Sequence, residues 1–292
     1  MNEPLVSPVI AIDGGGTQCR LALNDGKSIV AVETGSANVS TDFDGALNEI
    51  SSGLGSLAER AGLKLESLSR IPAFVGLAGM TGEAVSERLR TALPFTHVRI
   101  EDDRAAALRG ALGRADGAIA HCGTGSFFAA QCQGTMRCAG GWGPVLGDEA
   151  SAHFVGKAAL SMTLTCIDGQ HPTSPLAERI LEDCEGAEGI VRFAGSANPS
   201  EFGALAPLVT EFAKQGDMLA EHILRGGARD IFAMLQVIGW RNGQKICLTG
   251  GIGPCYAPYL PAGMQSDLTP PLEGPLAGAL SLAAEFAQEI RA

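Results

Sequence analysis

Short apolar runs of strand length alternate with glycine-rich turns in the first part of the chain. Residues 9–12 (Val-Ile-Ala-Ile) and 21–23 (Leu-Ala-Leu) are apolar, and residues 13–17 (Asp-Gly-Gly-Gly-Thr) lie between them. The turn sequence Asn-Asp-Gly follows at 24–26, and residues 28–33 again have the character of a strand. Turn residues between apolar runs are typical of β-hairpins. We therefore predict a hairpin with the glycines at its tip and a third strand after it.

The same pattern occurs a second time near the middle of the chain. Residues 118–122 and 127–132 are the two apolar runs, residues 123–126 (Gly-Thr-Gly-Ser) are the turn, and residues 135–139 are the third strand. The repetition indicates an internal duplication with a glycine–hydroxyl hairpin in each half. It predicts two similar lobes that hold one nucleotide in a cleft between them.

Helices and strands are expected to alternate after the first three strands. The predicted elements are helix 42–61 with Thr41 as its N-cap, strand 73–78, helix 83–93, strand 98–101 and helix 104–112. A β-β-β-α-β-α-β-α order is typical of a mixed sheet covered by helices, so the predicted fold class is α/β.

The second half is expected to contain a long helical insertion after its three strands. This insertion spans about residues 148–240, and a strand at 244–249 and a final helix at 275–290 follow it. We predict an N-terminal lobe over residues 1–114 and a C-terminal lobe over residues 115–292, with a final helix that can pack back on the first lobe.

Composition and charge limit the classes of function. The chain has 292 residues, is 46% hydrophobic and carries a formal net charge of −11, which argues against nucleic acid and anionic membranes as partners. Its eight cysteines show no paired spacing and are read as reduced, mostly buried thiols. The first residues lack the features of a secretion signal, and no apolar stretch is long enough to span a bilayer. We predict a soluble, cytoplasmic protein.

The first glycine turn has the chemistry of a phosphate site. Gly14, Gly15 and Gly16 have no Cβ atom that would keep a phosphate chain away from the backbone. The Asp13 carboxylate can hold a hydrated Mg²⁺, and the Thr17 hydroxyl can bind a phosphate oxygen. An ordinary turn explains Gly-Gly alone, but the strand-flanked sequence favours a phosphate site. The P-loop and dinucleotide-binding glycine patterns both fail to match.

An acidic triplet, Glu101-Asp102-Asp103, stands between a predicted strand and a predicted helix. A carboxylate at the C-terminal end of a strand lies where α/β proteins bind ligands, and it could act as a general base toward a hydroxyl. A single Asp here would more often be the N-cap of the helix. The triplet alone does not tell which residue acts.

A third group of residues suits a sugar ring. Residues 140–143 (Gly-Gly-Trp-Gly) are followed by residues 147–149 (Gly-Asp-Glu). An aromatic face can pack on a sugar, and a carboxylate can bind its hydroxyls. A Trp in a tight turn with Asp148 as a helix cap is an equally good interpretation.

Two further positions carry weaker signals. Gly250 and Gly251 follow a strand and could support an adenine or ribose, although a β–α turn is the commoner meaning. Asn38 could contact a sugar or simply occupy a turn. The five histidines have no metal-ligand spacing, so no zinc site is predicted.

The order of these motifs resembles that of the acetate/sugar kinase, hexokinase and actin ATPase superfamily. Within it the chain is similar to the BadF/BadG/BcrA/BcrD group, and most of all to its N-acetylglucosamine and glucosamine kinases. The resemblance extends from residue 9 to the final helix and implies two actin-like, ribonuclease H-like lobes. It implies an ATP-dependent kinase that phosphorylates the C6 hydroxyl of an amino sugar, with Mg²⁺. Phe127 replaces an Asn of the animal enzymes, which leaves the sugar's 2-substituent open.

The resemblance also implies a role for each motif. Asp103 is the implied catalytic base. The implied nucleotide contacts are Asp13 (with Mg²⁺ bound through water), Gly14, Gly15, Gly16, Thr17, Gly123, Thr124, Gly125, Ser126, Gly250 and Gly251. The implied sugar contacts are Asn38, Gly141, Trp142 and Asp148.

Two other classes remain as alternatives. Activator ATPases of 2-hydroxyacyl-CoA dehydratases belong to the same group and hold a 4Fe–4S cluster, but Cys122 directly precedes Gly123 here and does not match their cysteine spacing. The other alternative is a sugar sensor that binds its ligand without turnover. No helix-turn-helix is read before Pro8, which disfavours a transcription factor, and Asp103 favours an enzyme. The expected partners are an amino sugar and ATP, and a homodimer is left open.

Overall fold

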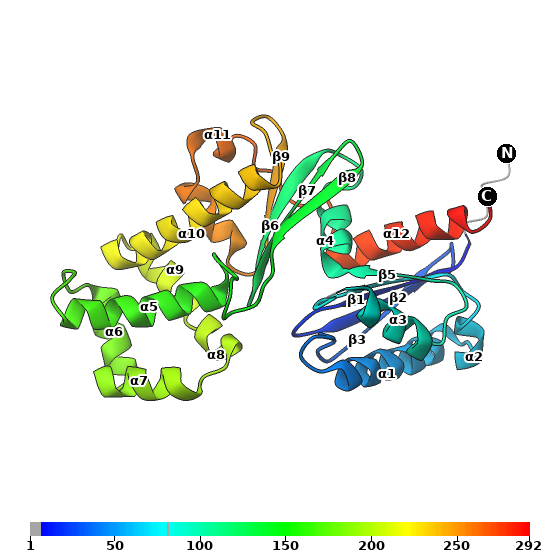
Figure 1. Ribbon diagram of the computed structural model, residues 1–292, viewed down its shortest axis with the longest axis horizontal. Coiled ribbons are helices and arrows are strands. Elements are labelled where there is room, and N and C mark those ends of the chain that lie inside the picture. The colour runs from blue at the N-terminus through cyan, green and yellow to red at the C-terminus, as the bar shows by residue number, and fades with distance from the viewer. Residues whose placement is uncertain (1–6, 81) are drawn as a thin grey trace. The chain divides into compact units, whose positions relative to one another are not determined.

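The chain forms two compact units of α/β structure (Figure 1). The computed structural model describes residues 7–80 and 82–292. The first unit combines Met1–Arg114 with Leu272–Ala292, and the second is Ala115–Pro271. Residues 1–6, which form part of the segment examined for a secretion signal, lie outside the described residues.

The first unit contains a five-stranded mixed sheet in the order β3-β2-β1-β4-β5. β1 pairs antiparallel with β2, which pairs antiparallel with β3, whereas β1, β4 and β5 run parallel. The strands are β1 (Val9–Gly14), β2 (Cys19–Asn24), β3 (Ile29–Thr34), β4 (Ala73–Leu77) and β5 (Val98–Asp102). The predicted α/β class and the mixed sheet are confirmed.

Helices cover both faces of this sheet. α1 (Phe43–Ala61) and α3 (Glu83–Ala92) share one apolar core with residues such as Ile10 and Leu21. α4 (Asp103–Leu112) and α12 (Pro275–Glu289) form the core of the opposite face. The sheet is therefore buried on both sides, which fixes the carboxyl ends of its parallel strands.

Two local details of the first unit differ from the prediction. Thr41 is not the N-cap of α1, because the Asp42 carboxylate accepts the backbone N–H of Gly45 at 2.9 Å. The Thr41 hydroxyl instead donates to the Asn38 carbonyl at 3.3 Å. A short helix, α2 (Leu65–Leu68), also follows α1 and was not predicted.

The second unit contains a four-stranded sheet in the order β8-β7-β6-β9. The strands are β6 (Gly117–Cys122), β7 (Ser126–Cys132), β8 (Thr135–Gly140) and β9 (Lys245–Thr249). β6 and β7 form the second predicted hairpin, and β9 lies parallel to β6. The two sheets thus share one arrangement, in which the first strand of the hairpin also pairs with a parallel strand, β4 in the first sheet and β9 in the second.

The expected helical insertion separates β8 from β9. Its helices are α5 (Ala152–Ile167), α6 (Pro175–Asp183), α7 (Ala187–Ser196), α8 (Pro199–Gly203), α9 (Ala206–Lys214) and α10 (Met218–Val237). A 3₁₀ helix, η1 (Gly253–Tyr259), and a short helix, α11 (Ala262–Gln265), come after β9. Neither of these two was predicted.

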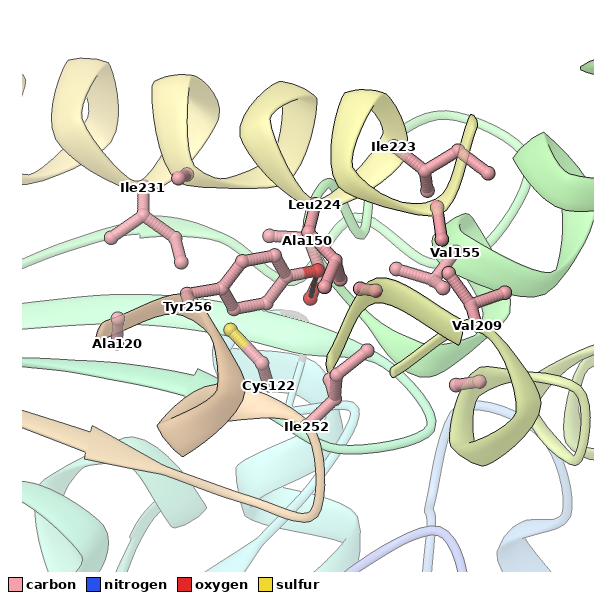
Figure 2. Close-up of a cluster of buried hydrophobic side chains, with 14 of the residues drawn as sticks. Ala120, Cys122, Ala150, Val155, Val209, Ile223, Leu224, Ile231, Ile252 and Tyr256 are labelled. Carbon is pink, nitrogen blue, oxygen red and sulfur yellow. Dashed lines mark hydrogen bonds between the residues drawn. The ribbon is translucent and has the colours of Figure 1, made fainter. Parts of the chain in front are cut away.

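The core of the second unit is centred on Tyr256 of η1 (Figure 2). Its ring is fully buried among apolar side chains that include Cys122 and Leu224. Its hydroxyl donates a hydrogen bond to the Ala150 carbonyl at 2.9 Å. A buried hydroxyl without a partner would destabilise the core, so this bond ties the loop before α5 to η1.

The cysteines are present as thiols. All eight cysteines are free. Four are buried, three are partly buried and Cys132 is exposed, so the expectation of mostly buried thiols holds for half of them. Across residues 7–80 and 82–292, no helix combines the length and apolar composition needed to cross a membrane.

Candidate functional site

The first glycine hairpin leaves part of its backbone open. Gly15 closes the turn by donating its N–H to the Gln18 carbonyl at 2.9 Å. A methyl group added at Gly16 would meet nothing within 4 Å, and one at Gly15 would only touch the Gln18 carbonyl at 3.6 Å. At Gly14 the same group would lie 2.5 Å from a Leu77 methyl. Gly14 is therefore required for packing, whereas Gly15 and Gly16 offer bare backbone, and Thr17 beside them is exposed.

Asp13 lies at the end of β1 beside this turn. The hairpin register places Arg20 of β2 opposite it, and Arg20 Nε is 3.8 Å from Asp13 Oδ2. Burial raises the pKa of the Asp13 carboxyl, and the positive charge of Arg20 opposes this rise. Arg20 was not singled out in the sequence. Its signal is the cross-strand register, which only becomes visible once the hairpin is fixed.

The acidic triplet lies where β5 meets α4, and its members have different roles. Asp102 is the N-cap of α4, because its Oδ1 accepts the Arg104 N–H at 3.0 Å. The same oxygen accepts from Arg104 Nε at 2.5 Å. Asp103 is the first residue of the helix. The capping role, which was the alternative to catalysis, therefore belongs to Asp102 and leaves Asp103 available.

Asp103 is held in a poorly solvated, acidic environment. Burial, followed by the charge of Asp102 and a hydrogen bond to its side chain, raises the pKa of Asp103 to about 8. The Asp13 carboxylate contributes in the same direction. Once ionised, a carboxylate with such a high proton affinity is a stronger base toward a hydroxyl than an ordinary carboxylate.

Asn38 lies beside the first hairpin in a tight turn. Its Oδ1 accepts the Ser40 N–H at 3.0 Å and the Ser40 hydroxyl at 2.8 Å. Gly79 packs against it, and a side chain there would collide with the Asn38 oxygen. Within the described part of the chain, the Asn38 amide nitrogen has no hydrogen-bond partner. The turn reading of Asn38 is thus correct, and its NH₂ group remains a donor for a ligand.

The second glycine hairpin is bound firmly to the start of α5. Gly123 donates its N–H to the Gly125 carbonyl at 2.9 Å. The carbonyls of Gly123 and Thr124 accept the N–H groups of Ala152 and His153 at 2.8 and 3.3 Å. Helix N-termini carry N–H groups without partners inside the helix, and here the turn satisfies two of them.

Ser126 and Asp148 add side-chain contacts to this turn. The Ser126 hydroxyl donates to the Glu149 carbonyl at 2.6 Å. Asp148 Oδ1 accepts the Gly143 N–H at 3.2 Å. A methyl group on Gly125 would lie 2.7 Å from Asp148 Oδ2. Position 125 therefore requires glycine, because the Asp148 carboxylate occupies the space that a side chain would fill.

Asp148 is a buried residue with a positive φ of 61°. Burial raises the pKa of its carboxyl, and hydrogen bonds from the backbone of Gly143 and Ser126 oppose the rise. The N-cap of α5 is Ser151, whose hydroxyl oxygen accepts the Phe154 N–H at 3.0 Å. The interpretation of Asp148 as a helix cap is wrong. Asp148 instead connects the Gly141–Gly143 turn to the second hairpin.

Trp142 presents an open aromatic face in that turn. Its side chain is 73% exposed, and the glycines on both sides, Gly141 and Gly143, have φ values of 74° and 84°. These left-handed conformations suit glycine and allow the sharp reversal. An exposed indole next to a buried carboxylate has the elements of a sugar-binding surface.

The two glycines after β9 differ in what they contribute. Gly250 has a φ of 79°, and a side chain there would overlap the carbonyl of Cys122. A methyl group at Gly251 would meet nothing within 4 Å. Gly250 is needed for close backbone packing against β6, and Gly251 is the one that offers an open surface.

The predicted residues gather in two groups, one in each unit. In the first unit they surround the carboxyl ends of β1 and β5, and in the second they surround the β6–β7 turn and the start of α5. Across residues 7–80 and 82–292, no group of three or more His, Cys, Asp or Glu side chains has the arrangement of a metal site. A metal bound here would need other ligands, such as water or substrate phosphates, and Mg²⁺ commonly uses both.

The fold and these two groups define an α/β protein of the two-lobed sugar-kinase kind. A ROK family glucokinase from Streptomyces griseus shares this fold with a TM-score of 0.55 at 17% identity, covering 97% of this chain and 100% of that one. Residues 10–260 match the BadF/BadG/BcrA/BcrD ATPase family. The chain belongs to this family, which confirms the resemblance seen in the sequence.

Its relatives include several amino-sugar kinases. Glucosamine kinase GspK of Vibrio cholerae is 28% identical over 278 residues, which cover 94% of this chain and 95% of that protein. An N-acetylmuramic acid/N-acetylglucosamine kinase of Clostridium acetobutylicum is 27% identical, with 83% and 84% coverage. A Chromobacterium violaceum structure, provisionally assigned as an N-acetylglucosamine kinase, is 30% identical with a TM-score of 0.83, covering 96% of this chain and 100% of that one.

The environment of Cys122 bears on the iron–sulfur alternative. Its side chain is fully buried in the core of the second unit, and this burial raises the pKa of its thiol. A cluster shared between subunits needs accessible thiolates. The structure therefore assigns Cys122 to the packed core of the second unit.

Proposed function

We propose that this chain is an ATP-dependent kinase that transfers a phosphoryl group to the C6 hydroxyl of glucosamine or N-acetylglucosamine. The observation that carries the proposal is Asp103. It is a half-buried carboxylate with a raised pKa, and the neighbouring Asp102 has taken over the capping of α4. Kinase relatives that match nearly the full length of the chain support the same reaction class.

In this proposal Asp103 accepts the proton of the attacking hydroxyl as the hydroxyl oxygen bonds to the γ-phosphorus and the bond to ADP breaks. The transition state of phosphoryl transfer is loose, so catalysis consists largely of positioning and charge stabilisation. The N–H group of Gly16 and the hydroxyl of Thr17 would bind phosphate oxygens. Gly15, whose N–H is donated to the Gln18 carbonyl, would let the phosphates approach the backbone because it has no side chain. The second hairpin, Gly123–Ser126, would bind the phosphates from its own unit.

Asp13 fits the role of a residue that holds hydrated Mg²⁺. Its carboxylate is at a strand end beside the open glycines, and the charge of Arg20 favours its ionised form. Bound Mg²⁺ would neutralise charge on the transferring phosphoryl group. Arg20 and the turn around Gly15 keep the carboxylate in place.

Each unit has its own candidate groups for a sugar. In the first unit, the Asn38 NH₂ group is a donor for a ring hydroxyl. In the second unit, the Asp148 carboxylate would bind ring hydroxyls, and the exposed face of Trp142 would cover an apolar face of the ring. Because Asp148 also holds the Gly141–Gly143 turn, the position of Trp142 depends on it. We place the protein in the cytoplasm, where ATP is supplied.

The proposal is tested by identifying the product. Purified protein is incubated with Mg–ATP and, in turn, glucosamine, N-acetylglucosamine, N-acetylmannosamine and glucose, and the products are examined by ³¹P NMR. We expect 6-phosphates of glucosamine or N-acetylglucosamine, and no product from the 6-deoxy analogue. A phosphate on another carbon, or no phosphorylated amino sugar at all, would contradict the proposal.

A further inference from the structure

α10 carries three nitrogen-bearing side chains on one face. His222, Arg225 and Arg229 are three and four residues apart, a spacing that aligns side chains on a helix. Together with Tyr259 of η1 they line a surface cavity of about 310 Å³. The chain has 32 acidic and 21 basic residues, so this concentration of cationic groups runs against its overall charge.

The contacts of the two arginines leave donors available. Arg225 donates to Glu221 Oε2 at 3.0 Å, and its guanidinium lies 5.3 Å from the centre of the Tyr259 ring. Arg229 forms no hydrogen bond or salt bridge with another of the described residues. Asp230 follows Arg229 in sequence; burial raises the pKa of its carboxyl, and the charge of Arg229 opposes this rise. Among the four side chains that line the cavity, two carry guanidinium groups and none carries a carboxylate.

A second, largely apolar cavity of about 370 Å³ lies beside the first. His222 lines both, and the ring of His171 at the second cavity is 6.3 Å from the ring of His222. The apolar wall of the second cavity includes Met162, Phe212 and Met218. A cationic cavity and an apolar cavity that share one side chain suit a ligand with an anionic end and an apolar body.

We propose that these cavities form a binding site for a small organic phosphate on the helical insertion. Arg225 and Arg229 would bind the phosphate oxygens, since the planar guanidinium fork matches phosphate geometry. The Tyr259 hydroxyl and the His222 ring would complete the phosphate site. The apolar part of the ligand would lie against Phe212 and Met218. This site involves none of the residues assigned to phosphoryl transfer.

The site is tested by titrating the full-length protein, labelled with ¹⁵N-arginine, with phenyl phosphate and separately with inorganic phosphate. The Nε–H signals of Arg225 and Arg229 are assigned with the Arg225→Gln and Arg229→Gln variants. We expect these two signals to shift, phenyl phosphate to bind at least several-fold more tightly than inorganic phosphate, and the double variant to lose tenfold or more in affinity. No turnover is measured, so failure of the proposed kinase function leaves this test intact.

Matched variants distinguish the site from general charge effects. Arg179 forms an i,i+4 pair with Asp183, as Arg225 does with Glu221, but lines neither cavity. Arg179→Gln should leave binding unchanged. Met218→Ala, at an exposed position, should weaken phenyl phosphate but not inorganic phosphate. Unchanged binding by the double variant, an equal loss in Arg179→Gln, or equal affinities for the two phosphates would overturn the proposal.

Discussion

The two glycine hairpins have similar sequences but different structural demands. In the first, backbone hydrogen bonds link Gly15 to Gln18 and Ala37, and a side chain at Gly16 would face open space. In the second, the turn is fixed to the start of α5, and the position beside Gly125 is filled by the Asp148 carboxylate. A glycine in such a motif can therefore leave space for a ligand in one copy and leave space for one of the protein's own side chains in the other.

The carboxylates near the two hairpins differ in a related way. Asp148 accepts backbone N–H groups that support its ionised form, and it holds a turn in place. Asp103 has no such support from the backbone, and an acidic neighbour raises its proton affinity. The first arrangement suits binding and the second suits proton transfer.

The largest effect is expected from removing the proposed base. Asp103→Asn keeps the shape but cannot accept a proton, so kcat should fall by roughly 10²–10⁴ while ATP and sugar still bind. Because burial and Asp102 raise the pKa of Asp103 from 3.8 to about 8, the folded state loses stability as pH rises between these two values, and the loss is complete above about pH 8. Asp103→Asn should therefore have an equal or higher Tm than the wild type at pH 8.5, measured by calorimetry.

Asp102→Asn and Glu101→Gln are the controls for this variant. Asn caps helices about as well as Asp, so Asp102→Asn should keep its fold and most of its activity. If Asp102→Asn loses more activity than Asp103→Asn, the base is Asp102 and the assignment to Asp103 is wrong.

Substituting one glycine in each hairpin should separate the two structural roles. A side chain in Gly16→Val would face open space, so this variant should leave Tm unchanged and weaken Mg–ATP binding about tenfold or more, measured by calorimetric titration. Gly125→Val must displace Asp148, so it should lower Tm and weaken both ATP and sugar. If both variants change Tm and ligand binding in the same way, the two hairpins do not differ in their structural roles.

Asp148→Ala should affect the sugar more than the nucleotide. A lost hydrogen bond to a charged group costs roughly 1.5–3 kcal/mol, which is about a ten- to hundredfold rise in the KM for the sugar. Steady-state kinetics with each substrate varied in turn would measure the split. Equal changes in both KM values would make Asp148 a purely structural residue.

The smallest expected effect is a shift in the pH profile. A base must be deprotonated to act, so kcat/KM should rise with pH up to about 8, the pKa of Asp103. Asp102→Asn removes the neighbouring charge and should lower that pKa, so its profile should move to lower pH. An unchanged profile in Asp102→Asn would mean that another group controls activity.

Local patterns in the sequence were enough to predict the sheets and the hairpins. Glycine turns between apolar runs specify hairpins over a few residues. The roles of individual carboxylates could not be predicted in this way. Whether Asp102 or Asp103 caps α4 depends on backbone angles at the strand end, and Asp42 replaced Thr41 at α1 for the same reason.

Contacts distant in sequence were also beyond prediction. Gly125 and Asp148 are far apart along the chain, and nothing in either motif shows that one fills the space beside the other. Likewise, the pairing of Arg20 with Asp13 requires the hairpin to be formed first. The sequence therefore names candidate residues, but it does not show which of them contact one another.

The most direct test of the central claim is the ratio of ADP released to sugar phosphate formed. If Asp103 activates a sugar hydroxyl, ADP release should depend on glucosamine or N-acetylglucosamine, with one ADP for each sugar phosphate. ADP released at the same rate with and without every sugar would contradict the claim, because the phosphoryl acceptor would then be water.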